Sequence, residues 1–104
     1  MNVPLRGEVW LADLGMVAKT RPVLIWSVQF GDRDYALFHI IPYTTTVRDS
    51  QFEVAIPVPW LKPGVFNVQG SQSVPRISLI RLIGTLNQLQ LASIEQAMRR
   101  WLGM

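Results

Sequence analysis

The chain has 104 residues, of which 49% are hydrophobic, and it carries a formal net charge of +3 at pH 7. This length suits one domain over residues 1–104, and the hydrophobic content excludes intrinsic disorder. Because there is no cysteine, disulfides, thiolate metal sites and a cysteine nucleophile are excluded. No apolar run approaches the ~20 residues that span a bilayer, and no signal peptide is visible. We therefore expect a cytoplasmic protein that does not bind a membrane.

Short apolar runs separated by turn residues indicate a chain made mainly of β-strands. Pro22 suits the first residue of a strand, where its missing N–H costs least. Gly70 interrupts a strand pattern and indicates a bulge or a close approach of the backbone. The expected strands cover residues 7–13, 22–29, 35–41, 52–56, 66–74 and 76–83, with loops at 15–20 and 44–51.

The last segment has the period of a helix instead. Asn87 and Gln90 have the spacing of a capping box, and Gly103 lies where a helix commonly ends in a left-handed residue. Between them, apolar residues recur at helical spacing from Leu91 to Leu102. We expect a mainly β fold, a strongly bent antiparallel sheet closing toward a small barrel, with this C-terminal helix covering its open flank.

Polar residues stand at the ends of two neighbouring strands. Arg21 opens the strand that begins with Pro22, and Thr44, Thr45 and Thr46 follow the next strand. A guanidinium beside hydroxyls offers many hydrogen-bond donors to a phosphate. Taken on spacing alone, a surface arginine beside a threonine-rich turn explains these residues more simply. Eight of the ten basic residues are arginines, which also suits phosphate binding.

The chain resembles the MazF/PemK (Kid) toxins of bacterial toxin–antitoxin systems. The resemblance covers nearly the whole chain, in the family's order. It is carried by Arg6-Gly7-Glu8-Val9-Trp10-Leu11-Ala12-Asp13-Leu14, Arg21-Pro22-Val23-Leu24-Ile25, Pro42-Tyr43-Thr44-Thr45, Phe52-Glu53-Val54, Gly84-Thr85-Leu86 and Trp101-Leu102-Gly103. It implies an SH3-like barrel with a C-terminal helix, acting as a homodimer. It also implies an endoribonuclease that cuts single-stranded RNA, chiefly mRNA, at short motifs without a metal or other cofactor, and that a cognate antitoxin neutralises.

The resemblance also assigns roles to particular residues. The catalytic arginine of the family falls on Arg21, and its catalytic threonine falls on Thr44. From the side chains around them we expect further RNA contacts from Lys19, Tyr43, Thr45, Thr46, Arg48 and Gln72. Trp10 could stack on a base, but core packing is the better explanation for a tryptophan inside a strand.

The chain departs from the family pattern at two places where relatives carry acidic residues. The loop at 14–20 is short and has no carboxylate, and the segment 70–72 reads Gly-Ser-Gln where some relatives have an aspartate. The identity of a general base is therefore open. His39 is the only histidine, which excludes a pair of catalytic histidines, and we expect it to be structural.

Two other functions remain as alternatives. One is a non-catalytic toxin-like domain that binds RNA or a partner. The other is a gyrase poison of the CcdB type, which resembles this family in fold and acts through residues of its terminal helix. The ending Trp101-Leu102-Gly103-Met104 keeps that possibility open, whereas Arg21 with Thr44 and Thr45 favours the nuclease.

Overall fold

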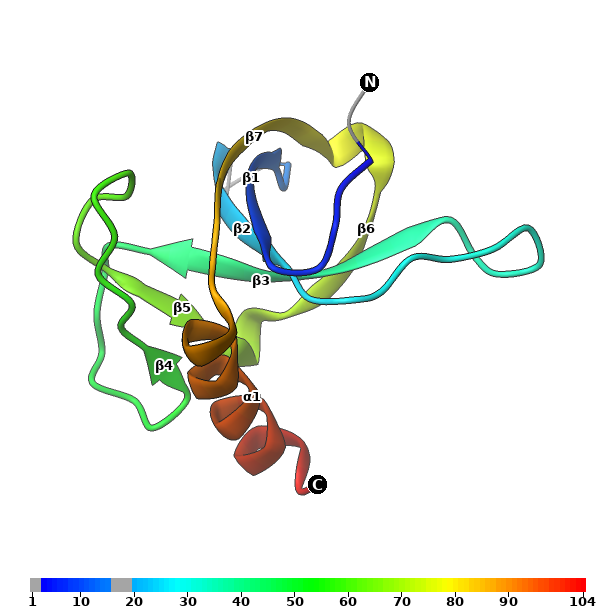
Figure 1. Ribbon diagram of the computed structural model, residues 1–104. Helices are drawn as coiled ribbons and strands as arrows, with labels where there is room; N and C mark the ends of the chain where they lie inside the picture. Colours follow the sequence, from blue (N-terminus) through cyan, green and yellow to red (C-terminus); the bar gives the residue numbers. More distant parts are fainter. Residues whose placement is uncertain (1–2, 16–19) are drawn as a thin grey trace.

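The computed structural model describes residues 3–15 and 20–104, which form a bent antiparallel sheet with one helix at its end (Figure 1). Within these ranges, no helix has the length and apolar character needed to cross a bilayer. The elements in chain order are β1 (Glu8–Asp13), β2 (Thr20–Ile25), β3 (Leu37–Thr44), β4 (Glu53–Val54), β5 (Val65–Asn67), the 3-10 turn η1 (Val68–Gly70), β6 (Gln72–Pro75), the 3-10 turn η2 (Arg76–Ser78), β7 (Leu79–Thr85) and α1 (Gln88–Leu102).

The seven strands form one sheet in the order β4-β5-β3-β2-β1-β7, and β6 also pairs with β3. The long strand β3 takes part in three ladders: it pairs with β2, its first half also pairs with β6, and its last two residues pair with β5. The expected mainly β class with a C-terminal helix is confirmed. The expected closure is not, because no ladder among the described residues joins β6 to β7. The turn η2 connects those two strands instead, so the sheet is curved but open.

The strand expected at 66–74 is interrupted by the 3-10 turn η1. The first three residues of the strand expected at 76–83 form the 3-10 turn η2, so that strand begins at Leu79. In η1 the side chain of Asn67 accepts a hydrogen bond from the backbone N–H of Gln69, which competes with strand pairing. A Cβ atom on Gly70 would lie 2.9 Å from Pro42 Cγ. Gly70 therefore marks a close approach of the backbone, one of the two interpretations made from the sequence, rather than a bulge in a strand.

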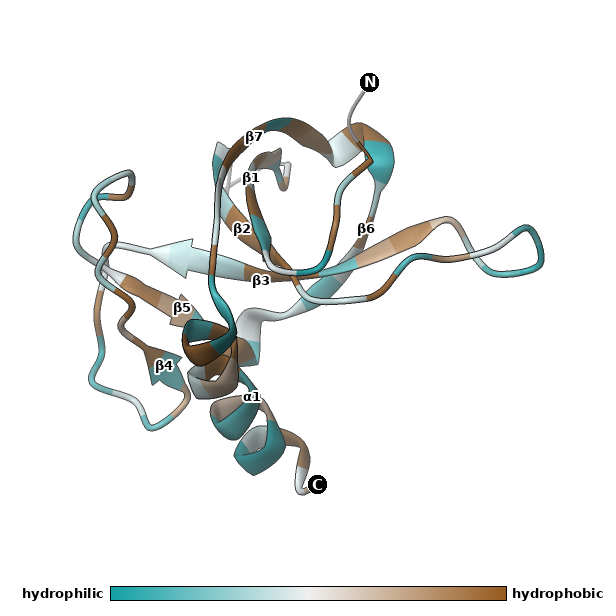
Figure 2. Cartoon of the chain, viewed as in Figure 1, coloured by the Kyte–Doolittle hydropathy of each residue, from teal (hydrophilic) through white to brown (hydrophobic). Residues whose placement is uncertain are grey.

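Hydrophobic residues pack on both faces of the central strands, because successive side chains of a strand point to opposite sides. Val9 and Leu24 belong to a cluster that also contains the buried face of α1, whereas Trp10 and Val23 belong to a second cluster inside the bend of the sheet. Figure 2 shows hydrophobic residues along β2 and the middle of β3 and hydrophilic residues at the loop tip that joins them. Trp10 is 2% exposed, so it packs in the core, as expected.

The helix begins and ends where the sequence predicts. Asn87 Oδ1 accepts a hydrogen bond from Gln90 N at 2.9 Å, and Gln90 Oε1 accepts one from Asn87 N at 2.8 Å. Gly103 has φ 70°, in the left-handed region. The buried side of α1 consists of Leu91, Ile94, Ala97 and Met98. These residues anchor the helix on the sheet and leave the ends of β2 and β3 accessible on another side of the molecule.

Candidate anion-binding site

Arg21 and Thr44 come together through the pairing of β2 with β3. The antiparallel register pairs Val23 with Pro42, and its continuation by two residues sets Arg21 opposite Thr44. Residues two apart on a strand project to the same face, so both side chains point to the side on which Val23 lies. The sequence pattern had suggested this meeting of a guanidinium and a hydroxyl, and the register provides it.

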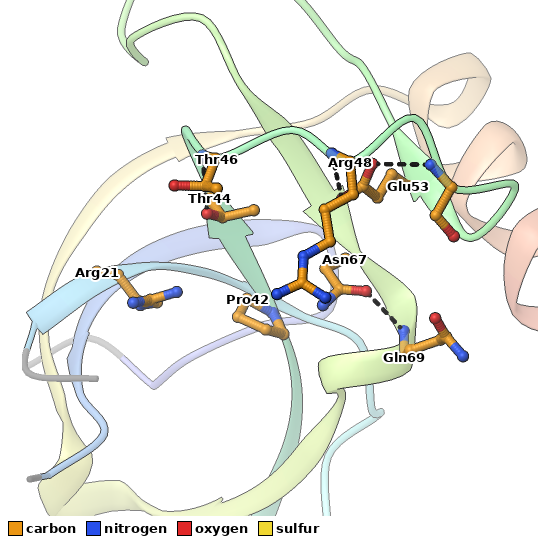
Figure 3. A pocket seen from close by; sticks show the side chains of 9 residues that line it. Arg21, Pro42, Thr44, Thr46, Arg48, Glu53, Asn67 and Gln69 are labelled. Carbon is orange, nitrogen blue, oxygen red and sulfur yellow. Dashed lines mark hydrogen bonds between the residues drawn. The ribbon is translucent and has the colours of Figure 1, made fainter. Parts of the chain in front are cut away.

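A cavity of about 300 Å³ opens in front of these two residues, and we call it the Arg48 pocket. Figure 3 shows the guanidinium groups of Arg21 and Arg48 pointing toward one another across Pro42. The residues that line it are Arg21, Pro42, Thr44, Thr46, Arg48, Ser50, Glu53, Asn67 and Gln69. Two cationic groups on opposite walls make this cavity suitable for an anion.

The guanidinium of Arg21 has hydrogen-bonding capacity to spare. Its Nε atom is buried and has no hydrogen-bond partner among the described residues. A buried donor left without a partner costs about 1–3 kcal/mol. An oxygen of a bound phosphate would satisfy this donor, so the unpartnered Nε of Arg21 is a feature expected of a site that binds an anionic ligand.

A second cavity, of about 510 Å³, shares Arg21, Thr44 and Thr46 with the first, and we call it the Lys62 pocket. Lys62 and Arg81 contribute further positive charge to its lining, and Trp60 contributes an aromatic ring. None of its described lining residues is a carboxylate. The two cavities therefore form a continuous basic surface on either side of the Arg21–Thr44 pair.

The threonines expected at the site are all present in it. Thr44 and Thr46 line both pockets, and Thr45 lines the Lys62 pocket. Thr44 Oγ1 accepts a hydrogen bond from the backbone N–H of Thr46 at 3.1 Å. This bond orients the Thr44 hydroxyl and leaves its own hydrogen available to a ligand oxygen.

Lys19, Gln72 and Tyr43 were also expected to contact RNA. Lys19 lies outside the described residues. Gln72 lies opposite Ile40 in the β3–β6 ladder and lines neither pocket. Tyr43 lines the Lys62 pocket but is only 4% exposed, and its hydroxyl donates to the carbonyl oxygen of Lys62 at 2.6 Å. Burial raises the pKa of Tyr43. Its ring belongs to the core and has no open face for base stacking.

Several residues of the site were missed from the sequence. In the Arg48 pocket these are Ser50, Glu53, Asn67 and Gln69; in the Lys62 pocket they are Trp60 and Lys62. Glu53 and Asn67 lie in the same pocket as Arg21 because β4 pairs with β5 and β5 pairs with β3. An Asn two residues before Gln69 predicts a local turn, but nothing local to the sequence places that turn beside Arg21.

The described residues include no cluster of three or more histidine, aspartate or glutamate side chains that could hold a metal ion. His39 lies in β3 away from both pockets, where its Nδ1 atom is 3.3 Å from Ser73 Oγ. Burial lowers the pKa of His39 from its ordinary value of 6.5. The positive charge of the candidate site thus comes from arginine and lysine.

The fold and the site define a small mainly β protein with a basic pocket at the end of its central strands. The model of the PemK-like, MazF-like toxins of type II toxin–antitoxin systems matches residues 5–102. This chain belongs to that family. A comparison with curated proteins gave no match.

Solved structures agree with this family assignment. An endoribonuclease in complex with its cognate antitoxin from a Mycobacterial species is similar with a TM-score of 0.84 and 27% identity, over 98% of this chain and 97% of that chain. The toxin MazF-mt6 of Mycobacterium tuberculosis is similar with a TM-score of 0.80 and 29% identity, over 93% of this chain and 97% of that chain. The MazE–MazF complex of Deinococcus radiodurans, at 22% identity and a TM-score of 0.82 over 100% and 99% of the two chains, shows the shared fold.

Proposed function

We propose that this toxin is a metal-independent endoribonuclease that cuts single-stranded RNA, chiefly mRNA, at short motifs in the cytoplasm. The observation that carries the proposal is the shared pocket of Arg21 and Thr44, with a buried Arg21 Nε that lacks a partner among the described residues. The family and the relatives described as endoribonucleases support it.

Two side chains of the pocket have the chemistry to hold the phosphate and stabilise its charge during RNA cleavage. The 2′-hydroxyl of RNA can give up its proton to water and attack the adjacent phosphorus, forming a 2′,3′-cyclic phosphate as the bond to the 5′-oxygen of the next nucleotide breaks. That oxygen takes up a proton from water, so the protein need not supply a nucleophile. It must hold the reacting atoms in line and stabilise the added negative charge. Arg21 clamps the phosphate oxygens and stabilises that charge, and Thr44 donates its hydroxyl hydrogen to the phosphate or orients the 2′-hydroxyl.

The two pockets offer a path for the strand on either side of the cleaved bond. Thr46 and Arg48 contact the backbone on one side, and Thr45 and Lys62 contact it on the other. The half-exposed ring of Trp60 provides a surface for a base in the Lys62 pocket, since stacking of this kind is worth about 1–3 kcal/mol per base. The motif that is cut then depends on which bases fit beside these groups.

The proposal extends to two protein partners. Relatives of this chain have been solved in complex with their cognate antitoxins. We propose that an antitoxin neutralises this toxin as well, by occupying the basic surface and excluding RNA. We also propose that the active form is a homodimer, as the family resemblance implies.

The direct test is cleavage of a long RNA by purified protein in the presence of EDTA, with the RNA ends mapped afterwards. Arg21→Ala should lower the cleavage rate by roughly 100–1000-fold, the effect of removing one donor that stabilises transition-state charge. Thr44→Val should also lower it, whereas Thr44→Ser, which keeps the hydroxyl, should retain most activity.

Three other results would contradict this proposal, each in a different way. Near wild-type cleavage by a folded Arg21→Ala variant would remove Arg21 from the mechanism. Binding of RNA without cleavage would indicate a non-catalytic binding domain. Inhibition of gyrase supercoiling without effect on RNA would indicate a gyrase poison.

A further inference from the structure

Glu53 is the one carboxylate among the described residues that line the Arg48 pocket. Its oxygens face the loop that precedes β4. Oε1 accepts hydrogen bonds from Arg48 N at 3.0 Å and from Ser50 N at 3.1 Å, and Oε2 lies 3.3 Å from Arg48 N. The backbone N–H of Glu53 in turn donates to the Ser50 carbonyl oxygen at 3.1 Å. One side chain thus closes the turn that carries Arg48.

This turn needs such a restraint. Asp49, between the two residues that Glu53 binds, has φ 58°, in the left-handed region. A residue other than glycine in that region costs of order 1–3 kcal/mol and persists where surrounding contacts enforce it. The two backbone bonds to Glu53 Oε1 provide that enforcement on both sides of Asp49. They hold the Arg48 backbone in the orientation that directs its guanidinium across Pro42 toward Arg21 (Figure 3).

The charge of Glu53 has the wrong sign for a residue whose only role is to line an anion pocket. A carboxylate lowers the affinity of a cavity for phosphate, because like charges repel. Electrostatics alone therefore predicts that removing Glu53 should strengthen RNA binding. The hydrogen bonds give Glu53 an opposite effect on binding, since they hold the backbone N–H of Arg48 in place.

We propose that Glu53 is a positioning residue for RNA cleavage, acting through Arg48: it fixes the turn at 48–50 so that Arg48 and Arg21 grip one phosphate from opposite sides. This inference rests on the proposed function. In this proposal Glu53 is not the general base, whose identity the sequence left open, because its oxygens accept hydrogen bonds from the backbone N–H groups of Arg48 and Ser50.

The variants Glu53→Ala and Glu53→Gln separate the possible roles. The glutamine variant keeps an oxygen that can accept both bonds now made to Oε1, but it loses the charge and the basicity. The alanine variant loses the acceptor oxygens as well as the charge and the basicity. Glu95→Ala is the matched control, since it removes an exposed carboxylate that pairs with Arg99 on α1.

The measurements are kcat and KM for cleavage, their pH dependence, and binding of a 2′-O-methyl RNA oligonucleotide that cannot be cleaved. Glu53→Ala should weaken oligonucleotide binding by about tenfold, the size of one charge-assisted hydrogen bond, and should raise KM. Glu53→Gln should restore most of the loss. Arg48→Ala should match Glu53→Ala, and the double variant should be no worse than Arg48→Ala alone. Thermal unfolding of each variant checks the fold.

Several results would overturn the proposal. Tighter binding by Glu53→Ala would show that the residue acts by its charge. Equal loss of kcat in Glu53→Ala and Glu53→Gln, with loss of the acidic limb of the pH profile, would make Glu53 the general base. Additive losses in the double variant would show that it does not act through Arg48. If the wild type binds the oligonucleotide but cuts no RNA, the proposed function fails while the binding data still decide the link between Glu53 and Arg48.

Discussion

Trp60 packs its indole directly against the backbone of Gly84, so that a Cβ atom on Gly84 would lie 2.6 Å from Trp60 Cε2. This contact joins the loop before β5 to the last strand, β7. Trp60, Lys62 and Arg81 line the same pocket, so the contact also sets the shape of one wall of the proposed RNA surface.

Replacing Gly84 with alanine should destabilise the protein by about 1–3 kcal/mol, because the added methyl group overpacks a rigid ring. The free energy of unfolding in urea measures this cost. The same substitution in a Trp60→Leu background should cost less, since the smaller side chain leaves room for the methyl group. An equal cost in both backgrounds would show that the strain at Gly84 does not come from Trp60.

The basic residues of the Lys62 pocket should contribute to RNA binding through charge. We expect Lys62→Ala and Arg81→Ala each to weaken binding of a single-stranded RNA and to reduce the slope of log K against log salt by about 0.7, because each removes one phosphate contact. Arg33→Ala, which removes the same charge from the loop between β2 and β3, is the control and should leave the slope unchanged. A similar change in slope for all three variants would indicate an effect of net charge alone.

Stability should fall in mild acid because of His39. Burial lowers its pKa below 6.5, so the unfolded state takes up a proton that the folded state resists. The contribution of His39 is therefore fully present above pH 6.5 and is lost as the pH falls through and below that value. The free energy of unfolding of the wild type and of His39→Gln, followed from about pH 7.5 to 5.5, should show a shallower decline for the variant. Parallel curves would mean that protonation of His39 is equally easy in both states.

Local signals in the sequence determined much of this molecule. Helix α1 was predictable at both ends because capping by Asn87 and Gln90 and the left-handed Gly103 involve neighbours in the chain. Short apolar runs between turn residues also identified β1 and the core of β2 and β3. Arg21 and Thr44 could be linked in advance because adjacent antiparallel strands bring the start of one beside the end of the next.

Only the tertiary structure decided the rest. The opening between β6 and β7 depends on the turn η2 and on how far the sheet bends, which no local pattern specifies. The turn at 67–69 and Glu53 lie in the pocket of Arg21 because strands distant in the chain pair with one another. The sequence around such residues does not show that they belong to the site. Their position there is set by the register of long-range strand pairs and not by their neighbours in the chain.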